Sequence, residues 1–147
     1  MTTKYYRAPL KLKSFFEDNN TQLDHCSLME SIDQNIELIL TTCPGEHGFN
    51  EDFGCKIWDM DFERVISKSK WEEDFTAHIK EAVKENEKRL NDVRVKIIMK
   101  DVQWEDGISQ TTAIRKKVDV IILGRVEETG QNCGFKYSLF MGPLSAD

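Results

Sequence analysis

The chain has 147 residues, a length typical of one domain, and its 20 basic and 26 acidic residues give a net charge of −6. This acidic balance argues against nucleic acid as a partner, because phosphate binding requires a basic surface. No apolar run approaches the roughly 20 residues that span a bilayer, so insertion into a membrane is not expected.

The four cysteines are widely spaced, with no C-x-x-C pair and no cluster with histidine; they are Cys26, Cys43, Cys55 and Cys133. This spacing predicts neither a metal site nor a bound cofactor. The first residues contain no apolar core of the kind found in signal peptides. The sequence therefore predicts reduced thiols and a cytoplasmic location.

Residues 1–20 are mixed and rich in aromatic side chains, and they are predicted to form an N-terminal arm before a single domain over residues 21–147. A first helix is predicted after Ser27, which forms an S-x-x-E capping box with Glu30. Apolar residues then recur at helical spacing: they are Leu28, Ile32, Ile36, Ile39 and Leu40. Pro44 and Gly45 end this helix.

A second capping box, Ser69 with Glu72, predicts the start of a second amphipathic helix. Its apolar face is formed by residues four apart, namely Trp71, Phe75, Ile79 and Val83. A short helical turn is expected before it, over Asp61–Ser67. Both helices precede the strands in the chain.

After Leu90 the apolar period changes to two, which predicts a strand over Val93–Met99. Asp101–Thr112 is polar and reads as a connection. A second strand is predicted over Val118–Gly124 and a third over Phe135–Met141, with a turn between them. Two amphipathic helices followed by a small, mainly antiparallel sheet indicate the α+β class.

The loop Gly45–Asp59, GEHGFNEDFGCKIWD, gathers carboxylates around His47 and Cys55 and raises the question of catalysis. Glu46 and Glu51 would be the acid and base of a glycoside hydrolase. The sequence supplies no sugar-binding cleft of grouped aromatic residues and no nucleophile elbow. A shaped loop, with glycines at its bends and Phe49 among its apolar anchors, is the preferred interpretation.

The order of these signals resembles the baseplate-wedge family of contractile injection machines, often labelled lysozyme-like, and within it most closely TssE of type VI secretion systems. The matching residues are Leu40-Thr41, Gly45-Glu46, Phe53-Gly54 and Glu87-Lys88-Arg89-Leu90. His47 replaces the arginine of the family's Gly-Glu-Arg turn, and Lys88 replaces the proline of its Glu-Pro-Arg motif. The first change removes a permanent cation, and the second removes a fixed φ.

The resemblance implies a structural baseplate component rather than an enzyme, with a fold like the interlocking (handshake) domain of the sheath protein. It implies other wedge subunits and the sheath protein as partners. Glu87, Arg89 and Leu90 would form the wedge-docking site, where Arg89 would donate charge-assisted hydrogen bonds. The loop motif would comprise Gly45, Glu46, His47, Phe53 and Gly54.

Sheath assembly would start at an open sheet edge, because exposed edges pair with other strands. The predicted edges are Lys117–Arg125, with Val120 and Ile122, and Phe135–Met141, with Tyr137 and Leu139. Alternatively, the N-terminal arm covers one of these edges. Two other function classes stay open from the residues: a peptidoglycan hydrolase, and a stand-alone adaptor that binds a helical partner.

Overall fold

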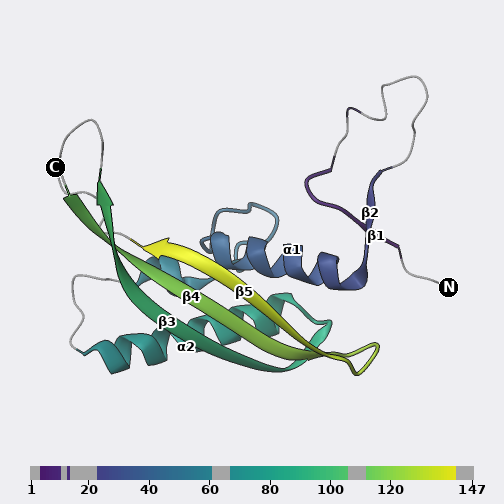
Figure 1. Ribbon diagram of the computed structural model, residues 1–147. Coiled ribbons are helices and arrows are strands. Elements are labelled where there is room, and N and C mark those ends of the chain that lie inside the picture. The colour runs from purple at the N-terminus through teal and green to yellow at the C-terminus, as the bar shows by residue number, and fades with distance from the viewer. Residues whose placement is uncertain (1–3, 11–12, 14–22, 61–66, 106–111, 142–147) are drawn as a thin grey trace.

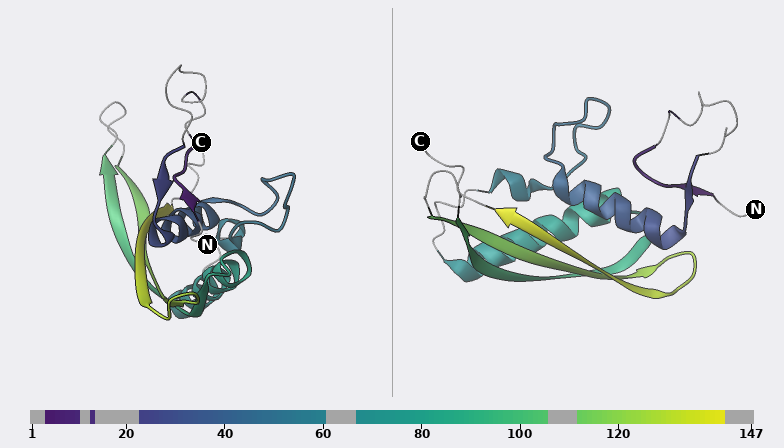
Figure 2. Two further views of the ribbon diagram at one scale, coloured as in Figure 1. Left: turned by 90° about the vertical axis from the view of Figure 1, so that its right-hand side faces the viewer. Right: turned by 45° about the horizontal axis from the view of Figure 1, so that its top comes forward.

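The computed structural model describes residues 4–10, 13, 23–60, 67–105 and 112–141 (Figure 1). Helices α1 (Leu28–Thr41) and α2 (Lys68–Asn86) pack on one face of an antiparallel sheet with strand order β3-β4-β5. Figure 2 shows both helices on the same side of this sheet. The predicted α+β class is confirmed.

Helix α1 begins where the capping box predicts. The Ser27 backbone N–H donates to the Glu30 carboxylate (2.8 Å), and the Glu30 N–H donates to Ser27 Oγ (3.1 Å). These two bonds satisfy donors that the first turn of a helix leaves unpaired. The apolar stripe of α1 is buried at Ile32, Ile36, Ile39 and Leu40.

Helix α2 begins two residues earlier than predicted. Ser67 is its N-cap and accepts a hydrogen bond from the Lys70 N–H (3.1 Å), so Ser69 lies inside the first turn. The Ser69–Glu72 capping box is therefore wrong: the earlier serine already has the extended backbone that a cap requires. Of the helical turn expected over Asp61–Ser67, residues 61–66 lie outside the described part; a 3-10 turn, η2, is found at Lys56–Asp59.

The strands are longer than their apolar cores. β3 covers Leu90–Glu105, β4 covers Thr112–Val126 and β5 covers Asn132–Met141. The expected connection over Asp101–Thr112 is thus wrong at its ends, because Asp101 pairs with Lys116 and Glu105 pairs with Thr112. The pairing continues past the apolar run of Val93–Met99, and there Val102 and Trp104 fall out of phase with it, so the period-two pattern breaks although the hairpin does not.

The core lies between the helices and the inward face of the sheet. It comprises the buried stripes of α1 and α2, Ile57 of η2 and alternate residues of β4 from Val118 onward. The β4 residues are Val118, Val120, Ile122 and Val126. Inward residues of β3 and β5 pack around them, which gives one contiguous core for the described chain.

The described part of the N-terminal arm forms strand β1 (Tyr5–Tyr6), which pairs antiparallel with β2 (His25–Cys26). This separate two-stranded sheet lies beside the start of α1, where Arg7 pairs with Glu30 (3.2 Å). The alternative that Tyr5 and Tyr6 cover an edge of the larger sheet is therefore wrong. Their backbone pairs with the segment that leads into α1 instead.

Candidate functional site

Glu87 is the C-cap of α2, and it is buried, with only 2% of its surface exposed. Its Oε1 accepts hydrogen bonds from Arg89 Nε (2.8 Å) and from the Arg89 backbone N–H (3.0 Å). Its Oε2 accepts from Arg89 Nη2 (2.8 Å) and from Asn35 Nδ2 (2.8 Å). The spacing of two residues lets one side chain chelate the other, so a buried charge has a partner at each oxygen.

Arg89 extends this network to two further elements. Its Nη1 donates to Ser31 Oγ on α1 (2.8 Å), and its guanidinium carbon lies 5.3 Å from the centre of the Tyr5 ring in β1. We call Glu87, Arg89, Ser31, Asn35 and Tyr5 the junction cluster. It joins both helices, the start of β3 and the N-terminal strand.

The electrostatics of the cluster favour the ionised pair. Burial alone would raise the pKa of Glu87, but hydrogen bonds from the side chains of Arg89 and Asn35 and from the Arg89 backbone hold it below its ordinary value. The hydrogen bond with Glu87 raises the pKa of Arg89 despite its partial burial. The solvated i,i+2 pair, the alternative to docking at this position, is therefore wrong.

The predicted docking residues thus lie together. The Arg89 donors named above, however, already form hydrogen bonds within the chain rather than pointing to a partner. Leu90 is buried at the start of β3. Lys88, where the family motif has proline, is exposed and donates from Nζ to the Lys84 carbonyl (3.3 Å). A docking role for Glu87, Arg89 and Leu90 stays a prediction, with the exposed third of Arg89 as the accessible part.

The loop after α1 is held by its own backbone. The Gly45 N–H donates to the Glu51 carbonyl (2.8 Å), and the Cys55 N–H donates to the Thr42 carbonyl (2.9 Å). At its far side, Trp58 Nε1 donates to the Leu40 carbonyl at the end of α1 (2.8 Å). The loop is therefore shaped and anchored, as the sequence predicts.

Gly54 occupies a position that only glycine fits. Its φ is +129°, and a Cβ there would lie 2.6 Å from the Thr42 carbonyl oxygen. Gly45 also has a positive φ, of +93°. The Phe53 ring meets the His47 ring edge-on with 5.6 Å between centres. The expectation that Phe49 anchors the loop is wrong, because this side chain is fully exposed at the loop tip.

The ionisable groups of the loop do not converge. Glu46, Glu51 and His47 are exposed, and the Glu46 carboxylate accepts no hydrogen bond from the described residues, so it does not hold the loop turn. The Cys55 thiol is buried, and burial raises its pKa to about 11. Within the described ranges, no group of acidic, histidine and cysteine side chains has the arrangement of a metal site.

The sheet edges differ from the prediction. β4 pairs with β3 on one side and β5 on the other, so Lys117–Arg125 is a central strand rather than an edge. Val120 and Ile122 are fully buried because they lie on the face of β4 that packs against the helices. Tyr137 and Leu139 do lie on an edge strand, β5, but their side chains face inward. The Tyr137 O–H donates to the Asp33 carbonyl of α1 (3.2 Å).

The junction cluster and the loop lie at opposite ends of α1. Ser31 lies in its first turn and Asn35 near its middle, while Leu40, whose carbonyl accepts the Trp58 hydrogen bond, lies about 13 Å beyond Ser31 along the axis. Sequence reasoning missed Ser31 and Asn35. Their signal was polar residues at i,i+4 spacing, each directly before a buried isoleucine of the apolar stripe.

In the described part of the chain, no helix is both long enough and apolar enough to pass through a bilayer. No match was found among curated proteins. A similar solved structure is a Geobacter sulfurreducens protein named as a tail lysozyme, with a TM-score of 0.59 and 22% identity over 82% of this chain and 96% of that chain. This likeness shows the fold alone.

The family model described as baseplate wedge protein gp25 matches residues 26–129. The match runs from Cys26 through both helices and the loop to the turn after β4, and it includes every residue of the junction cluster except Tyr5. Because it spans well over half of the chain, the protein belongs to the baseplate wedge protein gp25 family and is a structural component of a contractile-injection baseplate.

Proposed function

We propose that this family member is a baseplate component of a type VI secretion apparatus, of the TssE type, which joins the wedge and starts the sheath in the cytoplasm. The run Phe53-Gly54-Cys55 and its distance from Gly45-Glu46 support the type VI assignment. Its partners in this proposal are other wedge subunits and the sheath protein. No enzymatic activity is part of it.

The observation that carries sheath templating is the position of β5. This strand of ten residues pairs only with β4, so its outer edge has no strand partner among the described residues. Its register with β4 runs without a shift from Arg125–Asn132 to Lys116–Met141, and it contains no proline. A regular, unpaired edge of this length offers backbone donors and acceptors to an added strand.

The other edge, β3, is less suited to strand addition. Its pairing shifts between Asn91 and Arg94, and Asp92 has a φ of +53°, which marks a bulge. Bulges are one of the ways in which edge strands resist pairing with other chains. We therefore assign the template to β5.

Amide hydrogen exchange tests this assignment without any substitution. Every second amide of β5 is expected to gain protection when sheath is polymerised on assembled baseplates, whereas β4 amides are already protected in the free chain. The matched control is the same baseplate without sheath. Unchanged exchange over Asn132–Met141 in sheathed particles would show that sheath starts elsewhere.

Wedge docking at the end of α2 is tested at Lys88, which is exposed and lies between Glu87 and Arg89 of the junction cluster. Lys88→Glu is expected to weaken co-purification with wedge subunits while leaving the thermal midpoint nearly unchanged, because it breaks none of the Glu87 bonds. Lys80→Glu, at an exposed position within α2, is the matched control. Equal co-purification of both variants would place the wedge contact away from this end of the helix.

The non-enzymatic role is supported by the loop that carries the lysozyme-like label. The Glu46 and Glu51 carboxylates lie exposed, whereas a glycosidase acid requires an apolar pocket that raises its pKa. Digestion of purified peptidoglycan tests this directly. Wild-type cleavage that Glu46→Gln abolishes would establish a hydrolase instead.

A further inference from the structure

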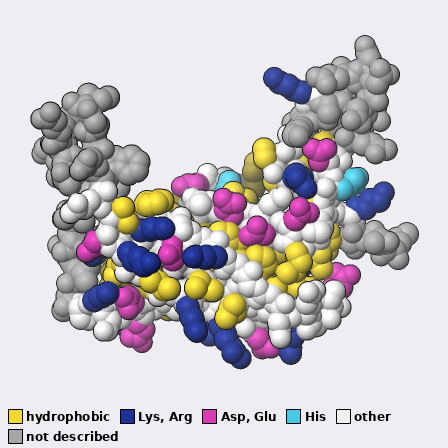
Figure 3. All heavy atoms as spheres, in the orientation of Figure 1, with side chains coloured by type: hydrophobic (Ala, Val, Ile, Leu, Met, Phe, Trp, Pro, Cys, Tyr) yellow, Lys and Arg dark blue, Asp and Glu magenta, His cyan; other side chains and the backbone are white. Residues whose placement is uncertain are grey.

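The outward face of the sheet, which turns away from both helices, has an unusual composition. Alternation along the three strands places on it the residues between the core positions. Its basic residues are Arg94, Lys96, Lys100, Lys117, Arg125 and Lys136. We call this surface the outer sheet face. Figure 3 shows dark-blue side chains gathered among yellow ones over this part of the molecule.

Few carboxylates balance these cations. Asp92 is paired with Arg125 (2.8 Å). Asp119 is nearly buried, accepts a hydrogen bond from Ser138 Oγ (2.7 Å) and lies 3.7 Å from Lys117. The bond from Ser138 and the charges of Lys117, Lys136 and Lys100 hold the pKa of Asp119 below its ordinary value. One carboxylate is thus shared by three lysines, in a chain whose net charge is −6.

Two of these lysines oppose each other directly. Lys100 and Lys117 are cross-strand partners, an arrangement that lowers the stability of a sheet because like charges face each other. Departures from such local rules in a folded protein tend to occur at functional sites. An anionic partner over this face would remove the repulsion.

The outer sheet face is also apolar. Ile98, Leu123 and Phe140 are 47%, 38% and 54% exposed, and Ile121 of β4 lies on the same face. In the register, Ile121 is flanked by Lys96 on β3 and Lys136 on β5. Basic and apolar side chains therefore alternate across the strands, so the face offers both charged and apolar contacts to a partner.

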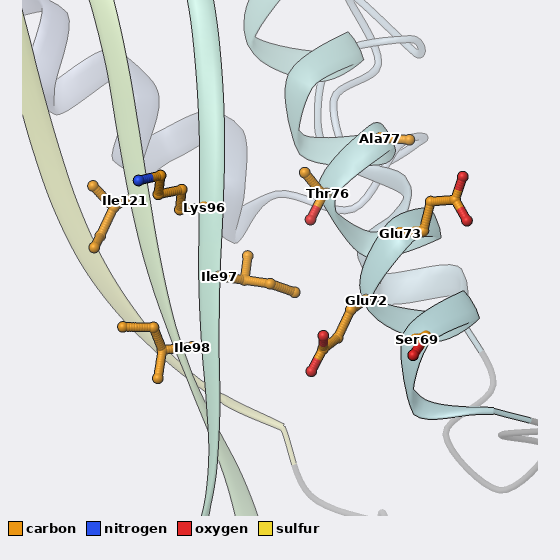
Figure 4. A pocket seen from close by; sticks show the side chains of 9 residues that line it. All are labelled: Ser69, Glu72, Glu73, Thr76, Ala77, Lys96, Ile97, Ile98 and Ile121. Atoms are coloured by element: carbon orange, nitrogen blue, oxygen red, sulfur yellow. The ribbon is translucent and has the colours of Figure 1, made fainter.

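An acidic rim limits what this face can bind. Along the β3 edge an open groove of about 590 Å³ is bounded by Lys96, Ile98 and Ile121 on the sheet side (Figure 4). On its other wall Glu72 of α2, which lies 3.8 Å from Lys68, points toward β3, whereas Glu73 points away from the strand. A long polyanion, such as nucleic acid or a membrane surface, would meet the Glu72 carboxylate as it left the basic face across the β3 edge. A short segment would stay within it.

The dimensions point to a helix. Three strands about 4.8 Å apart span about 10 Å, and the six steps from Arg94 to Lys100 span about 20 Å. A helix about 10 Å wide and about 13 residues long has this footprint. We propose that the outer sheet face binds an acidic amphipathic helix of another protein, whose apolar stripe covers Ile98, Ile121 and Phe140 and whose carboxylates meet the surrounding lysines.

A synthetic helical peptide of about 14 residues, with leucines at i, i+3, i+4 and i+7 and glutamates beside them, tests this in binding to the full chain. Binding is expected to weaken with added salt and to fall at least about tenfold in the double variant Lys96→Glu, Lys136→Glu. The double variant Lys80→Glu, Lys84→Glu, which reverses exposed charges on α2, is the matched control and is expected to bind normally.

Several results would overturn the proposal. These are equal binding of both double variants, equal binding of a peptide with lysine in place of glutamate, or equal binding of one with shuffled leucines. Tighter binding of a 20-base-pair DNA or of anionic vesicles would assign the face to polyanions. A dimer in sedimentation that the Lys96, Lys136 variant abolishes would assign it to a second copy. None of these outcomes bears on strand addition at β5, which hydrogen exchange tests separately.

Discussion

Replacing Arg89 by alanine should destabilise the fold, because it strips a buried carboxylate of its charged partner. Glu87 loses two charge-assisted hydrogen bonds of 2.8 Å, and Ser31 loses its donor. Removing one member of a buried pair costs roughly 3–5 kcal/mol. Asn35 and the backbone N–H of residue 89 still donate to Glu87 in this variant, so we expect a loss of stability at the lower end of this range, about 3 kcal/mol.

The loss should depend on pH. In the native protein the pKa of Glu87 is depressed, so its contribution is present above the pKa of the unfolded chain and is lost as pH falls through the folded value. Without the Arg89 side chain, burial dominates and raises the pKa of Glu87. As pH falls, Glu87 of the variant becomes protonated, and the cost of burying an unpaired charge disappears. The difference between the two proteins should therefore be largest near neutral pH and shrink below about pH 4.

Urea unfolding at pH 7 and pH 4 measures this difference, and a thermal shift of about 10 °C is expected at neutral pH. The double variant Glu87→Gln, Arg89→Ala is the control, since it removes the buried charge and should recover part of the loss. An unchanged midpoint, or the same loss at both pH values, would refute a buried ion pair at this junction.

Three further predictions concern the loop. Gly54→Ala should cost about 2 kcal/mol or more in urea unfolding because of its positive φ and the nearby Thr42 carbonyl, whereas Gly48→Ala, with open space around it, should change little. Glu46→Gln should change the free energy of unfolding by less than about 0.5 kcal/mol, since this carboxylate bonds to no described residue; a larger loss would reveal a stabilising contact. With its pKa near 11, Cys55 should react slowly with a disulfide reagent at pH 8 until urea unfolds the chain; fast native reaction would show that the thiol is accessible.

The helices and the class of the fold were predictable because their signals are local. The capping box of α1 and its apolar stripe lie within 14 consecutive residues, and the stripe follows the period of an α-helix. The strand ends were not, since in Asp101–Glu105 the apolar residues Val102 and Trp104 stand at even positions, out of phase with the odd-numbered apolar residues of Val93–Met99. When three consecutive antiparallel strands form a meander, the second strand in the chain is the central one. The central place of β4 could therefore have been predicted from the sequence, and the prediction of Lys117–Arg125 as an edge overlooked it.

The candidate site was predictable only in part. Family-like motifs identified Glu87 and Arg89, but the residues that complete the cluster lie far away along the chain. Asn35 and Ser31 are 52 and 58 positions from their partners. No local pattern encodes such contacts, because they arise when the packing of α1 on α2 brings polar side chains beside the end of α2. The residues of the outer sheet face, by contrast, follow from the alternation of side chains along each strand once the register is known.

The unshifted pairing of β4 with β5 also determines how the sheet carries mechanical load. Hydrogen bonds in an antiparallel ladder lie perpendicular to the strands. A pull along the axis of β5 therefore strains all the bonds of the ladder together, whereas a sideways pull opens them one after another. An assembly that contracts along the direction of β5 would load this sheet in shear, in which it resists rupture, and one that peeled β5 outward would meet only the strength of the last pair.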